Sequence, residues 1–231
     1  GIFQSYDEVL ASPTQTVVKD AVTGAIIPGK STYAGDIKFK DLNNDGVIND
    51  KDRTFIGNYL PDFSYGLNFS ASYKNFDISM LIQGTYGNDI YNGTKVLTQG
   101  MMRLFNQDKA VLNAWTPTNT STEIPRAVDG DPNKNSRTSD RFVEDGSYMR
   151  IKNLTLGYTL NNNAMPAFLK NAVSSVRIYV IAQNLLTLTG YSGYDPEVAA
   201  FGGNNGNLTN GVDFGQIPQP RTFIFGVRLS F

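Results

Sequence analysis

The sequence feature that most constrains the fold is a strict alternation of apolar and small polar residues in two adjacent stretches, 63–73 and 76–86. A period of two places successive side chains on opposite faces of a β-strand, so each stretch has one apolar face. Only Lys74 and Asn75 separate the stretches, which predicts a β-hairpin with a tight turn. The apolar face of the hairpin comprises Phe63, Tyr65, Leu67, Phe69, Ala71, Tyr73, Phe76, Ile78, Met80, Ile82, Gly84 and Tyr86.

Both arms of this hairpin have the length that crosses a bilayer. Each has 11 residues, which at about 3.3 Å per residue and about 40° of tilt span roughly 28 Å. Aromatic residues lie at the arm ends, with Tyr73 and Phe76 beside the turn and Tyr65 and Tyr86 at the far end, as in interfacial belts. A soluble sandwich would also alternate, but its strands are usually about 5–6 residues long. The small, uncharged polar face therefore favours a membrane barrel.

Three further stretches predict strands at 148–160, 175–186 and 221–231. In the first of them the apolar parity changes around Lys152 and Asn153, which predicts a β-bulge. If neighbouring strands are antiparallel, the short connections 74–75 and 161–174 lie at one end of the sheet. The long connections 87–147 and 188–220 then lie at the other end, as outer-membrane barrels require.

The last strand ends on an aromatic residue. Phe225, Leu229 and the final Phe231 share one face, and this pattern resembles the signal read by the bacterial outer-membrane barrel assembly machinery. A strand of a soluble β-protein could show the same alternation. The rest of the chain favours the barrel.

The composition excludes several classes of function. The 231 residues contain no cysteine and no histidine, which removes disulfides, thiolate zinc sites and the Ser-His-Asp triad. The net charge of −1 gives no electrostatic basis for a nucleic-acid partner. Carboxylate pairs such as Glu123 with Asp129, or Asp195 with Glu197, could serve a glycosidase, but nothing places either pair across a cleft. We expect no enzyme.

The acidic loop 41–52 has the ligand spacing of an EF-hand calcium loop, with Gly46 at the sixth position where the chain turns sharply. The candidate Ca²⁺ ligands, at loop positions 1, 3, 5, 7 and 12, are Asp41, Asn43, Asp45, the carbonyl of Val47, and Asp52. Asp in place of Glu at the twelfth position is less able to bind in a bidentate manner, and no clear helices flank the loop. The alternative is an Asx-rich turn with solvated carboxylates. No cofactor other than this candidate Ca²⁺ is expected.

Five ordered blocks, which together cover nearly the whole chain, resemble the carboxy-terminal barrel portion of the SusC/RagA family of TonB-dependent outer-membrane transporters of Bacteroidetes. The blocks are GDIKFKDLNNDGVINDKDRTFIGN at 35–58, PDFSYGLNFSASYKNFDISMLIQGTYGNDIYN at 61–92, SDRFVEDGSYMRIKNLTLGYTL at 139–160, VRIYVIAQNLLTLTGYSGYDPEV at 176–198 and PQPRTFIFGVRLSF at 218–231.

The resemblance implies an all-β fold, in which residues 1–231 supply the carboxy-terminal strands of an antiparallel, 22-stranded transmembrane β-barrel with long extracellular loops. It further implies a multi-pass location in the cell outer membrane, among outer-membrane lipid. In the family a SusD-like surface lipoprotein caps the barrel, and the pair imports glycans or oligopeptides with energy from the inner membrane.

The chain departs from this family pattern by what it lacks. It has no plug domain, no TonB box and no signal peptide. Five strands cannot close a barrel, because an open sheet edge in lipid leaves backbone groups unsatisfied. We therefore expect one portion of a longer polypeptide, which would contact the TonB complex through the missing amino-terminal region.

In this interpretation the loops 36–62, 87–147 and 188–220 contact the lipoprotein lid or the substrate. Loop aromatics are the candidate contacts, either stacking on sugar rings or packing on the lid, and they are Tyr91, Trp115, Tyr191, Tyr194 and Phe201. Their alternative role is to anchor the cores of the loops. The alternative function for the whole chain is a secreted soluble β-module whose calcium loop serves carbohydrate or partner binding.

Overall fold

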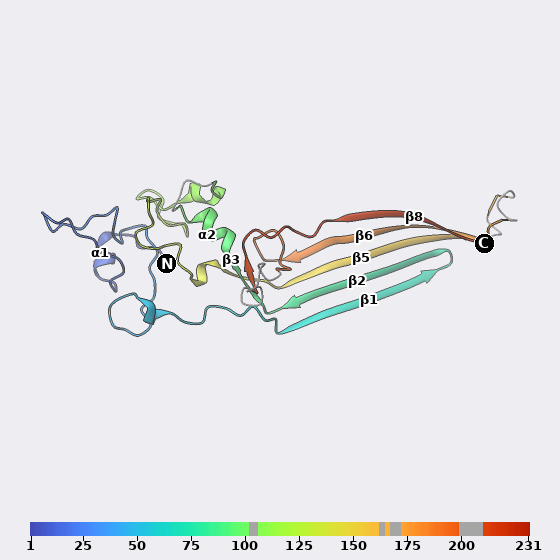
Figure 1. Ribbon diagram of the computed structural model, residues 1–231, viewed down its shortest axis with the longest axis horizontal. Helices are drawn as coiled ribbons and strands as arrows, with labels where there is room; N and C mark the ends of the chain where they lie inside the picture. Colours follow the sequence, from blue (N-terminus) through green and yellow to red (C-terminus); the bar gives the residue numbers. More distant parts are fainter. Residues whose placement is uncertain (102–105, 162–164, 167–171, 199–209) are drawn as a thin grey trace, which may run out of the picture. The chain divides into compact units, whose positions relative to one another are not determined.

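The computed structural model describes residues 1–101, 106–161, 165–166, 172–198 and 210–231. The chain divides into two compact units (Figure 1). We call residues 1–56 with 92–143 the loop unit, and residues 57–91 with 144–231 the sheet unit. The sequence predicts no such division. No helix in the described ranges has the length and apolar character needed to cross a membrane.

The sheet unit is built on a five-stranded antiparallel sheet in the order β1-β2-β5-β6-β8 (Figure 1). Each strand coincides to within three residues with a strand expected from the alternating pattern. The bounds are Phe63–Tyr73 for β1, Phe76–Tyr86 for β2, Tyr148–Asn161 for β5, Ser175–Thr189 for β6 and Thr222–Ser230 for β8.

The register confirms both the hairpin and the bulge. Tyr73 pairs with Phe76 across the two-residue turn, in which Lys74 adopts a left-handed conformation with φ 54°. The pairing of β5 with both neighbours shifts between Ile151 and Asn153, which leaves Lys152 without a partner across the strand. The parity change in the sequence therefore corresponds to one extra residue on β5.

The strand order confirms how the connections are sorted. Since the five strands are antiparallel and each is hydrogen-bonded to the next one in the sheet, β1–β2 and β5–β6 are joined at one end. We call this the turn end, marked by Tyr73 and Phe76. The long connections β2–β5 and β6–β8 leave from the opposite end, the loop end, marked by Phe63 and Tyr86.

Segments of the two long connections form a second sheet of three short strands. Its order is β4-β3-β7, with bounds Val143–Asp145 for β4, Asp89–Asn92 for β3 and Val212–Asp213 for β7. Ile90 at its centre is buried. The sheet therefore gathers the beginning and end of the 87–147 connection and the last part of the 188–220 connection.

The loop unit contains little regular structure. Its helices are α1 (Tyr6–Leu10) and α2 (Gly93–Gln99), with 3₁₀ turns η1 (Asp50–Asp52), η2 (Lys109–Asn113) and η3 (Asp140–Phe142). Among its described residues, the largest buried apolar side chains are Phe3, Phe142 and Trp115.

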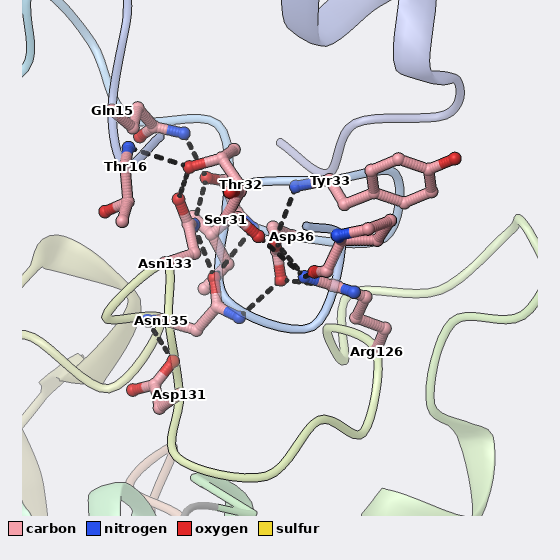
Figure 2. A network of polar contacts seen from close by, with 12 residues as sticks. Gln15, Thr16, Ser31, Thr32, Tyr33, Asp36, Arg126, Asp131, Asn133 and Asn135 are labelled. Atoms are coloured by element: carbon pink, nitrogen blue, oxygen red, sulfur yellow. Dashed lines mark hydrogen bonds and ion pairs between the residues drawn. The ribbon is translucent and has the colours of Figure 1, made fainter. Parts of the chain in front are cut away.

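A buried polar network takes the place of a larger apolar core in the loop unit, as Figure 2 shows. Arg126 holds the fully buried Asp36 with two contacts, from Nε to Oδ1 at 2.9 Å and from a terminal nitrogen to Oδ2 at 2.8 Å. Asn135 donates to the same Asp36 carboxylate, and Thr32 donates to Asn133 at 2.6 Å. Such a network stabilises the fold only when every member is satisfied. Here it joins two segments about 90 residues apart.

Candidate functional site

One face of the five-stranded sheet is apolar across all five strands. The register places one residue of each strand in a continuous row, and the middle row consists of Phe69, Met80, Leu154, Ala182 and Phe223. Side chains of this face on both edge strands, such as Leu67 and Phe225, are exposed. An apolar patch of this extent is not stable against water and indicates a covered surface.

Aromatic side chains frame the two ends of this apolar face. At the turn end, the rings of Phe76 and Tyr158 lie 4.6 Å apart, next to Tyr73 on β1. At the loop end, Phe63 stacks on Tyr86 at 5.4 Å. The predicted clustering of aromatics at the arm ends is thus observed, and it extends to β5.

The opposite face is mostly polar and is cross-linked near the turn end. Arg177 on β6 reaches across β5 to Asp77 on β2, with Nε 2.9 Å from Oδ1. Gly157 lies between them on β5, and a Cβ at that position would collide with both side chains. The glycine therefore allows two charged residues from non-adjacent strands to meet.

A larger ion cluster lies on the polar face towards the loop end. Arg150 of β5 contacts Asp195 and Glu197, each at 2.6 Å, and donates to Thr187 at 2.8 Å. Lys152, the bulge residue, lies 2.9 Å from Glu197. We call Arg150, Lys152, Asp195 and Glu197 the Arg150 cluster. It fastens the loop after β6 to the polar face of the sheet.

Asp195 is the carboxylate at the centre of the Arg150 cluster. Its two oxygens also accept the backbone N–H groups of Glu197 and Gln219, both at 2.9 Å. Burial alone would raise the pKa of Asp195, but these two N–H groups and the Arg150 guanidinium outweigh it and lower the pKa. Asp195 therefore stays ionised and holds three segments of the chain together.

Two further contacts hold the loop that carries Asp195. Tyr191 donates its hydroxyl to Asp213 at 2.6 Å, and burial followed by this acidic partner raises the tyrosine pKa. Ser192 donates both its backbone N–H and its hydroxyl to Glu144, each at 2.9 Å. The segment 191–197 is thus held through contacts of four of its residues, which are Tyr191, Ser192, Asp195 and Glu197.

The structure corrects two of the five candidate loop contacts. Trp115 is 8% exposed and donates its indole N–H to Gln4, and Tyr191 is 5% exposed. Each ring anchors the interior of a loop, because its polar atom finds a partner inside the chain while its body covers neighbouring backbone. Neither is a surface contact.

The other three aromatic candidates differ from these. Tyr194 is 73% exposed, and Tyr91 is half-buried on β3. Phe201 lies outside the described residues. Tyr194 thus has the most accessible ring among the candidates that the structure describes.

Sequence reasoning missed the Arg150 cluster, although its carboxylates were noticed. Asp195 and Glu197 were weighed as a glycosidase pair, but in the structure both are neutralised by the basic residues of β5. The sequence does contain a signal for this cluster. Two basic residues, Arg150 and Lys152, lie near the loop end of the predicted strand 148–160, and two carboxylates lie close together in the connection that leaves from the same end of the sheet. Asp195 and Glu197 are therefore structural ion-pair partners of β5 rather than the acid and base of a catalytic site.

The acidic loop adopts the Asx-rich turn. Asp41 accepts the N–H groups of Asn44 at 2.7 Å and Gly46 at 2.8 Å, and Asp52 accepts those of Asn49 and Leu42. The Asn49 N–H, followed by that of Leu42, lowers the pKa of Asp52. In the described part of the chain no three acidic side chains are gathered as metal ligands. Calcium binding stays a prediction.

The residues of the predicted assembly signal lie at the end of the sheet. Phe225 and Leu229 are exposed on the apolar face of β8, and the exposed Phe231 follows the last residue of that strand. Recognition by an assembly machinery stays a prediction.

Comparisons with known proteins agree with the motifs. The chain is 40% identical over 210 residues to TonB-dependent receptor P3 of Formosa agariphila, covering 90% of this chain and 20% of that protein. It is 30% identical over 199 residues to TonB-dependent receptor SusC of Bacteroides thetaiotaomicron, covering 84% and 17%. No family model matches.

Solved structures show the same relationship. The RagAB peptide importer in its open-open state matches with a TM-score of 0.63 and 26% identity, covering 100% of this chain and 21% of that one. The RagAB peptide transporter matches with a TM-score of 0.60 and 31% identity, covering 74% and 17%.

The class that these findings define is the TonB-dependent receptors. Within that class the chain is a relative of SusC and RagA, as its motifs indicated, and it spans about a fifth of the length of the relatives that it matches. These relatives are receptors and transporters by name, in line with the expectation of no enzyme.

Proposed function

We propose that the chain forms part of the wall of a transmembrane β-barrel in the outer membrane, and that the complete barrel carries out TonB-dependent import of glycans or oligopeptides. The observation that carries this proposal is the sheet with one continuous apolar face framed by aromatic rows. In lipid, such a face is stable without further cover.

The edges of the sheet support a larger closed structure. β1 and β8 are the outer strands of the five, and each leaves one row of backbone groups unpaired within the sheet. In lipid those groups need partners, which further strands of a 22-stranded barrel would supply. The greater length of the relatives leaves room for such strands, and for a plug and a TonB-contacting segment.

The polar face then lines the lumen, and the Arg150 cluster holds the loop 191–197 against it at the loop end. Asp195 is buried and Ser192 is tied to Glu144, so Tyr194 between them projects from a fixed backbone. A preorganised exposed aromatic binds with little loss of conformational entropy. We assign Tyr194 to contact with a SusD-like lipoprotein or with the substrate.

The relatives point to a class of substrate. One solved relative is described as a peptide importer, which supports oligopeptides for this chain, and glycans remain the alternative substrate. A SusD-like lipoprotein is proposed as partner on the same grounds of relationship.

Fractionation of the source membranes tests the location. We expect peptides of this chain in the outer-membrane fraction, on a band much larger than its own 25.4 kDa, together with a co-purifying lipoprotein. A soluble species of that smaller size would overturn the proposal and favour the secreted β-module.

Substitution of Tyr194 tests the loop contact. Tyr194→Ala is expected to reduce co-purification of the lipoprotein or uptake of oligopeptides. The matched control is Tyr73→Ala, because Tyr73 is 72% exposed but lies at the turn end. Equal effects of the two variants would contradict a specific role for Tyr194.

A further inference from the structure

The apolar face has a hollow of about 440 Å³ near the turn end of the sheet unit. Its lining is almost entirely apolar and crosses all five strands. The side chains that shape it are Ala71, Tyr73, Phe76, Leu156, Ile178 and Phe225.

The register explains why this part of the face is hollow. Ala71 of β1 lies in the same row as Leu156 of β5 and Phe225 of β8. The small methyl group of Ala71 leaves space beside Tyr73, which lies two residues further along β1. The paired rings of Phe76 and Tyr158 bound the hollow towards the turn, and Phe225 bounds it on β8.

A lysine side chain lies next to one of the rings that line the hollow. Lys74 is the first of the two turn residues between Tyr73 and Phe76, both of which line the hollow, and its ammonium lies 5.3 Å from the centre of the Tyr73 ring. The nearest acidic residue in sequence, Asp77, is engaged by Arg177 on the other face. Within the described ranges Lys74 forms no ion pair, so its charge is available to an external anion.

We propose that this hollow binds an acyl chain of an inner-leaflet glycerophospholipid, whose phosphate pairs with Lys74. The inference rests on the proposed location in the outer membrane, with the turn end towards the periplasm. The parts of the site follow the same order as the parts of a phospholipid. The apolar hollow takes the acyl chain, Tyr73 lies at the interface, and the ammonium of Lys74 lies at the depth of the headgroup.

The phosphate contact supplies the selectivity of this site. An acyl chain in a bilayer is already surrounded by hydrocarbon, so entering the hollow gains packing rather than hydrophobic transfer energy. A lipid without a charged headgroup should therefore bind less well than one with a phosphate. Lys74 is the group that distinguishes the two.

The test measures retention of two defined lipids by the protein purified from outer membranes in detergent. The probes are a phosphatidylglycerol and a diacylglycerol with the same two chains, counted by native mass spectrometry. Lys74→Gln removes the charge in the same turn, and Ala71→Trp fills the hollow. The controls are Lys30→Gln, at an exposed position of the loop unit, and Leu67→Trp, on the same face of β1 but outside the hollow.

The wild type is expected to retain phosphatidylglycerol in preference to diacylglycerol. Lys74→Gln should weaken phosphatidylglycerol binding about fivefold, the usual contribution of one basic residue near an anionic lipid surface, and bring it to the level of diacylglycerol. Ala71→Trp should reduce binding of both lipids, and the two controls should match the wild type.

Equal retention of the two lipids by the wild type, or an unchanged Lys74→Gln variant, would overturn the inference. If the protein is recovered from outer membranes with that result, the lipid site alone fails and the proposed function stands. Absence of the protein from outer membranes would overturn both.

Discussion

Arg150 and Asp195 form an ion pair of 2.6 Å in which neither side chain is more than 5% exposed. The pair links the loop end of β5, the central strand of the sheet, to the loop after β6, across 45 residues of sequence. Buried charges of this kind are stable only together, because either one alone would lack both water and a counter-ion. The loop that carries Tyr194 therefore depends on a residue of β5.

Removal of the guanidinium should loosen this loop. Arg150→Ala is expected to lower the free energy of unfolding by about 3–5 kcal/mol, since Asp195 would be left buried without its partner. Denaturant unfolding in detergent measures the loss, and proteolysis between residues 190 and 219 should become faster. Lys152→Ala is the control, because that ammonium is only half-buried and its loss should cost about 1 kcal/mol or less. Equal losses for both variants would contradict the central role of Arg150.

The same cluster should make stability sensitive to acid. The pKa of Asp195 is lowered in the folded protein, because the backbone N–H groups and Arg150 together outweigh the effect of burial. A carboxyl of this kind stabilises the fold above its unfolded pKa of about 3.9, and the contribution is lost as the pH falls through the lower folded value.

Melting temperatures between pH 7 and pH 3 measure this effect. Asp195→Asn should be less stable than the wild type at pH 7 and at pH 5 by a similar amount. The difference should begin to shrink below about pH 4, where the carboxyl becomes protonated in the unfolded chain while it is still ionised in the folded protein. A difference that stays constant down to pH 3 would show that the Asp195 charge does not contribute.

The sheet was predictable because its information is local. Alternation along each strand specifies the faces, and the parity change at Lys152 specifies the bulge. The ion pairs and hydrogen bonds that join distant loop segments could not be predicted in this way. Arg126 lies 90 residues from Asp36, and no periodicity connects them. For Trp115 and Tyr191 the sequence leaves two roles open, surface contact or loop anchor, and the burial of both rings selects the anchor, since amphipathic rings can form a small core in a polar loop.

Trp115 provides a test of the packing in the loop unit. Gly35 has φ +90°, and a Cβ at this position would collide with the Trp115 ring and with the stem of Arg126. Gly35→Ala should cost about 1–2 kcal/mol for the left-handed backbone and about 1–3 kcal/mol more for overpacking. Because Trp115 is the one tryptophan of the chain, its emission should shift to the red.

Gly24→Ala is the matched control for this substitution. Gly24 also has positive φ, at +69°, but open space surrounds its position. It should show only the cost of the backbone and no change in emission. A red shift in both variants would mean that Trp115 reports general unfolding of the unit.

The acidic loop predicts calcium binding that titration can check. If the loop takes Ca²⁺, isothermal titration should give one site that Asp45→Asn weakens, because Asp45 stands at loop position 5 and is the third of the five candidate ligands. Asp50→Asn should leave binding unchanged, since Asp50 is exposed beside Arg53 and lies outside the five candidate ligands. No heat of binding in the wild type would leave the Asx-rich turn as the whole role of this loop.

Arginine substitutions on adjacent residues of β1 test which face meets lipid. Leu67 lies on the apolar face near the middle of the strand and Asn68 on the polar face. In a bilayer, Leu67→Arg should destabilise the protein by about 2–4 kcal/mol, whereas Asn68→Arg faces the water-filled lumen and should cost little. Unfolding in lipid vesicles and the yield of folded protein in outer membranes measure the difference. In water the exposed Leu67 would tolerate arginine as well as Asn68 does, so equal behaviour would contradict a lipid-facing sheet. A large loss of stability confined to Leu67→Arg would mean that the apolar face of β1 lies in lipid, where a charge is costly, while the polar face meets water.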